Sequence, residues 1–219
     1  MNTLYLLENH SHLSPDAAAL VGAAGKELTR VSRIVRQSLS YYRVGSIAKE
    51  LDLSAVVEDS LQIFADKLQL AGIELARSTM SEARIMGYPD EVRQVVDNLL
   101  LNAIEATPQG GRLRVALHRS RDWKDHNKPG FRLTIADTGH GIPRECMDRI
   151  FEPFYTTKAE KGTGLGLWVV RGIVAKHDGS IGLRSSDAAG RSGTVVSVLW
   201  PIAVQGQRTG MLVRSESAG

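Results

Sequence analysis

The chain has 219 residues, of which 42% are hydrophobic and 23% charged, and its formal net charge is +3. These proportions are those of an ordinary globular protein, and the small charge, without a basic stripe interleaved with aromatics, argues against nucleic acid as a partner. No apolar run reaches the roughly 18 residues of a membrane-spanning helix, so no membrane contact is expected from this segment. The single cysteine, Cys146, excludes an internal disulfide and fits a reducing, cytoplasmic compartment.

The first predicted element is a long helix from Ser14 to about Tyr42, which ends at a break over Val44-Gly45-Ser46. Ser14 is a good N-cap residue, and Pro15 and Asp16 suit the first turn of a helix. The apolar positions alternate spacings of three and four, which is typical of a helix that packs lengthwise against other helices. An ordinary amphipathic helix of the main domain is the alternative. The positions with this spacing of three and four are Val21, Ala24, Leu28, Val31, Val35, Ser38 and Tyr42.

From Leu51 onward, helical and strand patterns alternate. Ser54 is the expected N-cap of the next helix, and Gly72 is expected to stop it. Because the helices fall between pairs of strands, the pattern favours an α+β fold, a two-layer α/β sandwich with helices on one face of a mixed sheet. Residues 203–219 are polar and aperiodic and are expected to form a mobile tail. Helices are expected over 54–70, 89–106 and from the glycines at 162–166 to about 177, and strands over 73–76, 83–87, 112–119, 131–137, 181–185 and 194–200.

Three clusters carry chemistry, and the first lies on the helix expected over 89–106. Asn98 and Asn102 are four residues apart, so both amides lie on one helix face. An amide oxygen is a hard, neutral ligand that suits Mg²⁺ already carrying phosphate charge. Capping of nearby backbone groups by these amides is the alternative that the spacing leaves open.

The second cluster follows the strand expected over 131–137. Asp137 stands at the end of this apolar strand and is followed by Gly139 and Gly141, which places one carboxylate at the rim of a pocket. Such an acceptor can take a hydrogen bond from an exocyclic amine such as that of adenine. The sequence Asp-Thr-Gly also occurs in aspartic proteases, but these need two carboxylates that share a proton, and this chain has one copy.

The third cluster opens the helix that is expected to end near residue 177. Its glycines, Gly162, Gly164 and Gly166, let backbone N–H groups approach phosphate oxygens, and the helix N-terminus adds positive potential. The spacing matches neither the dinucleotide-binding pattern nor a P-loop. Lys158 and Lys161 precede the turn and favour an anion, with solvated surface charges as the alternative.

Five motifs occur in a fixed order along the chain. They are Asn98…Asn102-Ala103, Asp137-x-Gly139-x-Gly141, Phe151-Glu152-Pro153-Phe154, Gly162-Thr163-Gly164-Leu165-Gly166-Leu167 and Gly193-Thr194. This set resembles the ATP-binding domain of sensor histidine kinases. The resemblance covers about Leu51 to Pro201 and implies the histidine-kinase/gyrase-type ATPase (Bergerat) fold. It divides the chain into a partial dimerisation hairpin over 1–45, a catalytic domain over 46–202 and the tail over 203–219.

The resemblance also implies a role for individual residues. Asn98 and Asn102 would hold Mg²⁺, and Asp137 would bind the adenine amine. Asn98 and Lys158 would act in catalysis, and a lid over 156–162 would cover the phosphates. The residues implied for ATP are Asn98, Asn102, Asp137, Gly139, Gly141, Thr156, Thr157, Lys161, Gly162, Thr163, Gly164, Leu165, Gly166 and Thr194.

One position separates the kinases from the ATPases of this fold. The ATPases need a glutamate as general base where this chain has Asn98, and an amide cannot accept a proton. Glu91 and Glu105, on the same helix, are expected to be surface or structural groups. The expected activity is therefore transfer of a phosphoryl group from Mg-ATP to a protein histidine and then to a response-regulator receiver domain. A non-catalytic ATP-binding and dimerisation module, a gyrase-type ATPase and a serine-directed kinase are the alternatives.

The first 45 residues resemble only the end of the family's dimerisation hairpin, so a homodimer through the N-terminal helices is expected. The phosphorylated histidine would lie before Met1, as would any membrane anchor of the full-length protein, and this segment alone is expected not to phosphorylate itself. His10 and His12 lie in a polar turn with no acid after them and are expected to be solvated. His177 is expected to cap the end of its helix, where a cation suits the helix dipole.

Overall fold

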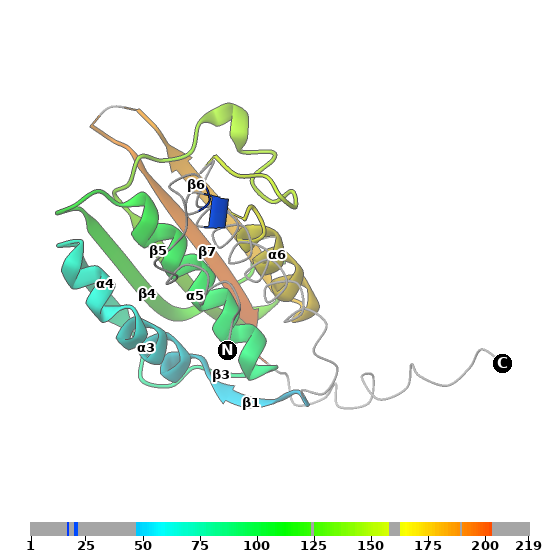
Figure 1. Cartoon of the computed structure of the whole chain (residues 1–219). Coiled ribbons are helices and arrows are strands. Elements are labelled where there is room, and N and C mark those ends of the chain that lie inside the picture. The colour runs from blue at the N-terminus through cyan, green and yellow to red at the C-terminus, as the bar shows by residue number, and fades with distance from the viewer. Residues whose placement is uncertain are drawn as a thin grey trace.

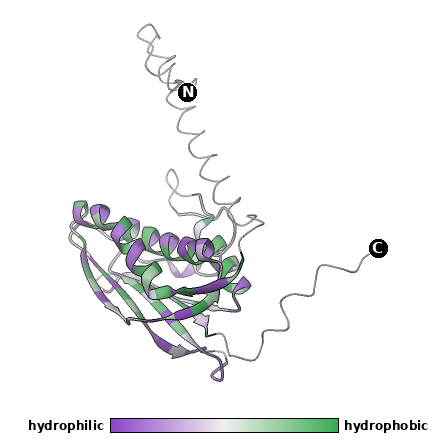
Figure 2. Ribbon diagram, turned by 90° about the horizontal axis from the view of Figure 1, so that it is seen from below, coloured by the Kyte–Doolittle hydropathy of each residue, from purple (hydrophilic) through white to green (hydrophobic). Residues whose placement is uncertain are grey.

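The computed structural model describes residues 17, 20–21, 47–123, 125–157, 163–188 and 190–202. The larger of its two sheets has five strands in the order β2-β4-β5-β7-β6, and β1 pairs with β3 in a second sheet. Figures 1 and 2 show the helices along one side of the five-stranded sheet. The elements are β1 (Lys49–Asp52), α3 (Leu53–Ile63), α4 (Ala65–Leu70), β2 (Glu74–Thr79), β3 (Arg84–Gly87), α5 (Pro89–Ala106), β4 (Arg112–Arg121), β5 (Pro129–Asp137), the 3₁₀ turn η1 (Arg144–Cys146), α6 (Gly166–Lys176), β6 (Ser180–Ser186) and β7 (Gly193–Pro201).

The large sheet is mixed. Strand β2 pairs with β4 in parallel, whereas the pairs β4–β5, β5–β7 and β6–β7 are antiparallel. A mixed sheet with helices on one side is a two-layer α+β architecture. The fold class predicted from the sequence is therefore confirmed.

The core lies between the helices and the sheet and follows from two periodicities. Helix α5 buries apolar residues at spacings of three and four, and β4 buries every second residue. Each fully buried Leu or Val contributes roughly 1.5–3 kcal/mol to folding. The buried residues of these elements and of α6 include Val92, Val95, Val96, Leu99, Leu100, Leu113, Val115, Leu117, Val169, Val170, Ile173 and Val174.

Helix α5 has clear signals at both ends. Pro89 occupies its first turn together with Asp90 and Glu91, whose charges suit the positive end of the helix dipole. At the other end Thr107 donates its hydroxyl to the carbonyl of Ala103 at 2.7 Å. These signals hold the helix that carries Asn98 and Asn102 in the predicted place.

The N-cap of α3 is Asp52, so the prediction of Ser54 as cap is wrong. The Asp52 carboxylate accepts the N–H groups of Ser54 and Ala83, each at 3.0 Å. Burial raises the pKa of Asp52, but these two backbone donors, the Ser54 side chain and the charge of Arg84 together hold the pKa below the ordinary value of 3.8. The predicted single helix over 54–70 is also divided, because Phe64 separates α3 from α4.

Several strands also differ from the sequence prediction. Strand β1 was not predicted, because its four residues carry no apolar alternation long enough to mark a strand. Strands β4 and β5 extend beyond the predicted 112–119 and 131–137, which shortens the polar loop between them.

The predicted hairpin over 1–45 and the tail over 203–219 lie outside the described residues, except for residues 17, 20 and 21, which are helical. Among the described helices, none combines the length and apolar character needed to cross a membrane.

Candidate functional site

A cavity of about 200 Å³ lies between the helix layer and the sheet. Its walls come from the second half of α5, the start of α6, the loop after β5, the segment 155–157 and strands β5, β6 and β7. These elements are far apart in the sequence, and the sheet order brings them together. The predicted site residues that line this cavity are Asn98, Asn102, Asp137, Gly141, Thr156, Thr157, Thr163, Gly164, Gly166 and Thr194.

The other predicted site residues divide into two groups. Gly139 does not line the cavity, but its N–H donates to Asp137. Leu165 does not line the cavity and is a buried residue, 2% exposed. Lys158, Lys161 and Gly162 lie outside the described residues. Their predicted roles therefore stay predictions.

The sheet offers the cavity an apolar row and a polar row side by side. In the strand register Val196 pairs with Ile135 and with Leu183, and all three line the cavity. Two residues along, Thr194 pairs with Asp137 on one side and with Ser185 on the other. A flat ring can lie against the apolar row while its polar edge meets the second row.

Asp137 is held at the end of β5 by two backbone donors. One of its oxygens, Oδ1, accepts the N–H of Gly139 at 2.9 Å and the N–H of Thr194 at 3.2 Å. An ionised carboxylate only accepts hydrogen bonds, so Asp137 suits a ligand group that donates, such as an exocyclic amine. The role predicted for Asp137, binding of an adenine amine, stays a prediction.

The loop after β5 lies directly on the end of β6. Gly141 has φ +75°, and a Cβ at this position would lie 1.9 Å from the carbonyl oxygen of Ser186. A side chain cannot occupy that space, and the positive φ is itself unfavourable for residues other than glycine. Glycine at 141 therefore lets this loop close one side of the cavity.

The two asparagines lie at the other end of the cavity, beside the start of α6. A Cβ added to Gly166 would lie 3.7 Å from the side-chain nitrogen of Asn102, so the N-terminus of α6 reaches this residue. The side-chain nitrogen of Asn98 is buried and, among the described residues, has no hydrogen-bond partner. An orphaned polar atom in a cavity wall is a group that a ligand would satisfy, and either end of an amide can face that ligand.

The donor set fits Mg²⁺ that arrives with phosphates. In the described part of the chain, no three His, Cys, Asp or Glu side chains gather in a way that could hold a metal ion. Asn98 and Asn102 line the cavity, and their amide oxygens would be ligands from α5. Mg²⁺ retains waters and substrate phosphates as ligands and does not need a full protein cage.

The glycine turn before α6 packs against the segment that precedes the predicted lid. Gly164 has φ +66°, and a Cβ there would lie 2.3 Å from the carbonyl carbon of Phe154. This contact brings together Phe154 and Gly164, which flank 156–162 in the sequence. Helix α6 then begins at Gly166, so its free N–H groups lie at the cavity, where they suit an anion.

Sequence reasoning missed the apolar wall of the cavity and one aromatic residue. Ile135, Leu183 and Val196 looked like ordinary strand residues, and only the strand register shows that they share one patch. Tyr155 also lines the cavity. A hydrogen bond with the thiol of Cys146 raises the pKa of the Tyr155 hydroxyl above its ordinary value of 10.0, so the phenol stays protonated at neutral pH.

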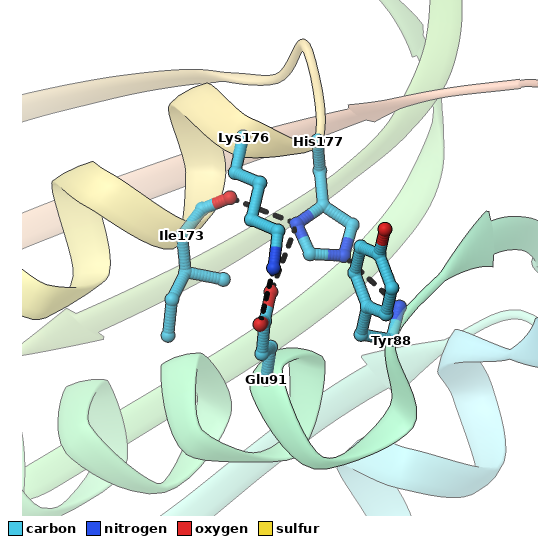
Figure 3. A network of polar contacts seen from close by, with 5 residues as sticks. All are labelled: Tyr88, Glu91, Ile173, Lys176 and His177. Atoms are coloured by element: carbon cyan, nitrogen blue, oxygen red, sulfur yellow. Dashed lines mark hydrogen bonds and ion pairs between the residues drawn. The ribbon is translucent and has the colours of Figure 1, made fainter. Parts of the chain in front are cut away.

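A polar tie joins the start of α5 to the end of α6 (Figure 3). The cavity is lined by the second half of α5 and the start of α6, so the tie lies at the far end of both helices. Lys176 Nζ lies 2.6 Å from Glu91 Oε1. His177 Nε2 accepts the N–H of Tyr88 at 3.1 Å, and Nδ1 lies 2.8 Å from the carbonyl oxygen of Ile173. Because a carbonyl only accepts and an N–H only donates, the ring carries its proton on Nδ1 and is neutral.

This arrangement confirms one prediction about the tie and corrects another. His177 is the C-cap of α6, as predicted. The prediction of a cation at His177 is wrong, because both ring nitrogens are committed to backbone partners, and Lys176 supplies the charge instead. Glu91 is a structural group, since its side chain is only 9% exposed.

Replacing Lys176 by methionine should lower the free energy of unfolding by about 1–3 kcal/mol, because it leaves a buried carboxylate without its partner. The value lies below that of a fully buried pair because the Lys176 side chain is 43% exposed. Urea unfolding at pH 7 measures the effect. The control is Arg93→Met, which breaks the exposed ion pair between Arg93 of α5 and Asp59 of α3. It should lower the free energy of unfolding by at most about 1 kcal/mol. Equal losses in the two variants would contradict a special role of the tie.

Residues 87–204, more than half of the chain, match the family described as histidine kinase-, DNA gyrase B-, and HSP90-like ATPase. The chain belongs to this family. The match includes α5, the cavity and the five-stranded sheet except β2. The predicted resemblance is therefore confirmed at the level of the ATPase family.

Individual relatives of this ATPase-family chain are sensor histidine kinases. Sensor histidine kinase ZraS of Escherichia coli K12 is 35% identical over 184 residues, which are 82% of this chain and 37% of that protein. The chain thus spans little more than a third of this relative. The structure of the mycobacterial sensor histidine kinase MprB is 29% identical with a TM-score of 0.60, over 71% of this chain and 97% of that one. Histidine kinase ThkA, in a complex with response regulator protein TrrA, shares the fold at 24% identity, with a TM-score of 0.65 over 91% of this chain and 55% of that one.

Proposed function

We propose that this chain is the catalytic region of a sensor histidine kinase, which binds Mg-ATP and presents its γ-phosphoryl group to a protein histidine. One observation carries the proposal, which is that the two ends of one cavity differ in chemistry. At one end Asp137 can accept hydrogen bonds, and at the other Asn98, Asn102 and the N-terminus of α6 suit Mg²⁺ and phosphate. The two ends suit the two ends of a nucleoside triphosphate. The relationship to ZraS and MprB supports the kinase assignment within the family.

At the base end, the ring would lie on Ile135, Val196 and Leu183, and Asp137 would accept the exocyclic amine. At the phosphate end, the N–H groups around Gly164 and Gly166 would donate to phosphate oxygens. Asn98 and Asn102 would hold Mg²⁺, which when bound neutralises part of the phosphate charge. Lys158 and Lys161, in the predicted lid, would add positive charge at the transferring group.

Asn98 favours transfer to another protein group over hydrolysis. Phosphoryl transfer to water needs a group that positions or deprotonates the water, and the amide of Asn98 cannot accept a proton. Of the two other acids on α5, Glu91 pairs with Lys176 and lies outside the cavity wall. Glu105 is exposed and lines the cavity, so it is the acid that the ATPase alternative would have to use as a base. Because Asn98 stands where the ATPases need a glutamate, we expect a kinase rather than a gyrase-type ATPase.

The acceptor histidine is not His177, although Asp178 follows it. Its ring is buried and both nitrogens bond to backbone groups, so neither is available to attack a phosphate. We place the acceptor on the helical dimerisation hairpin and expect this chain alone not to phosphorylate itself. The same proposal includes a homodimer through the N-terminal helices, onward transfer to a response-regulator receiver domain and a cytoplasmic location, where ATP is available. The ThkA–TrrA complex is a precedent for the regulator as partner.

Titration calorimetry and a phosphate-release assay test the proposal. We expect ATP and ADP to bind in a Mg²⁺-dependent way, with phosphate release at the background rate, because the amide of Asn98 cannot act as a base for water. Absence of nucleotide binding would contradict the proposal. Steady phosphate release would favour the gyrase-type ATPase, and a stable complex with a longer kinase that never transfers phosphate would favour the non-catalytic module.

A further inference from the structure

Ser185 of β6 lies behind the cavity wall and contacts three groups around the base end of the site. It is not a lining residue itself. The N–H of Ile142 donates to its Oγ at 2.8 Å. Its Oγ also lies 2.9 Å from the carbonyl oxygen of Gly193 and 2.8 Å from the hydroxyl of Thr194. Ile142 and Thr194 both line the cavity, so Ser185 touches the wall at two points.

Counting protons fixes the direction of these hydrogen bonds. A serine hydroxyl has one proton to donate and two lone pairs to accept with. The carbonyl of Gly193 can only accept, so it takes the Ser185 proton, and the N–H of Ile142 fills one lone pair. The Thr194 hydroxyl must then donate to the second lone pair of Ser185. All three contacts are hydrogen bonds only in this arrangement.

The proton count determines what Thr194 can offer a ligand. With its proton directed to Ser185, the Thr194 hydroxyl can only accept a hydrogen bond from the cavity. Its neighbour in the strand register, Asp137, is an acceptor as well and takes the backbone N–H of Thr194 at 3.2 Å. The polar row of the cavity thus presents two acceptors side by side.

We infer that Ser185 is a positioning residue that fixes the Thr194 hydroxyl as an acceptor and thereby makes the site select a 6-aminopurine over a 6-oxopurine. This inference rests on the proposed nucleotide site and adds the source of its base selectivity. A 6-amino group donates to both acceptors, whereas a 6-oxo group brings lone pairs toward lone pairs. Without Ser185, the Thr194 hydroxyl can rotate and donate to an oxo group.

Competition binding with ADP and inosine diphosphate tests the inference, because these nucleotides differ at the 6-position of the purine. In Ser185→Ala the ratio of ADP affinity to inosine diphosphate affinity should fall by about tenfold, since one of two selective contacts is lost. Ser185→Thr keeps the hydroxyl and should restore the ratio. The matched control is Ser197→Ala, which removes a hydroxyl of β7 that bonds to Thr134 at 3.1 Å and does not line the cavity. This control should keep the wild-type ratio.

Three outcomes would overturn the inference. One is a Ser185→Ala ratio equal to that of the wild type. Another is an equal loss of both affinities, which would indicate a merely structural role. The last is a Ser185→Thr protein with a wild-type unfolding midpoint and a ratio as low as that of Ser185→Ala. If the wild-type chain binds neither nucleotide, the proposed function fails instead, so the two failures are distinguishable.

Discussion

Replacing Asp137 by asparagine should lower the affinity for ADP by about 100-fold or more, because a donor then faces the exocyclic amine that the carboxylate accepted. The side chain keeps its size. The remaining amide oxygen can still accept the N–H groups of Gly139 and Thr194, which hold the wild-type carboxylate at 2.9 and 3.2 Å. The variant should therefore fold normally and fail to bind, which separates a binding defect from unfolding.

Titration calorimetry with ADP and Mg²⁺ measures the loss, and urea unfolding checks the fold. Asp59→Asn is the control, because it makes the same chemical change in an exposed carboxylate of α3 that pairs with Arg93. It should bind ADP with wild-type affinity. Unchanged affinity in Asp137→Asn would remove this residue from the base site and with it the assignment of the cavity.

Replacing Gly141 by alanine should destabilise the chain by about 3 kcal/mol or more, because backbone strain and steric overlap add. The residue has φ +75°, and the new Cβ would lie 1.9 Å from the carbonyl oxygen of Ser186. That oxygen belongs to the backbone of β6 and cannot rotate away. The loop after β5 must shift, so ADP affinity should fall together with stability.

Gly110→Ala separates the two contributions. Gly110 has the same φ of +75°, but nothing lies within 4 Å of an added Cβ. This control should cost only about 1–2 kcal/mol, the strain of the left-handed conformation. Urea unfolding of both variants gives the difference that belongs to the overlap with Ser186. Equal losses would mean that the loop has room to move away from β6.

Much of the fold followed from local patterns in the sequence. Helix α5 was predicted with its bounds because Pro89 opens it and its apolar residues repeat at helical spacing. The N-cap of α3 was misplaced because Asp52 and Ser54 are both good capping residues, and the choice depends on the N–H of Ala83, 31 positions from Asp52. Strand β1 depends on its pairing with β3 and has no pattern of its own.

The site divides in the same way. Asp137, Asn98 and Asn102 were predicted because their residue types and spacings are unusual for core positions. The apolar wall and Ser185 were not, since their roles depend on register between strands β5, β7 and β6. His177 was predicted as a cap but with the wrong charge, because the N–H of Tyr88 comes from a segment 89 positions away.

The polar tie between Glu91 and Lys176 holds α5 and α6 together at one end of the two helices. The second half of α5 and the start of α6 line the cavity, so the tie lies at the opposite end of the two helices. From Glu91 to Asn102 the lever is about 16 Å long, so a rotation of about 5° at the tie displaces Asn102 by about 1.4 Å. Side chains that no bound nucleotide would touch therefore help to set where Asn102 lies against the start of α6.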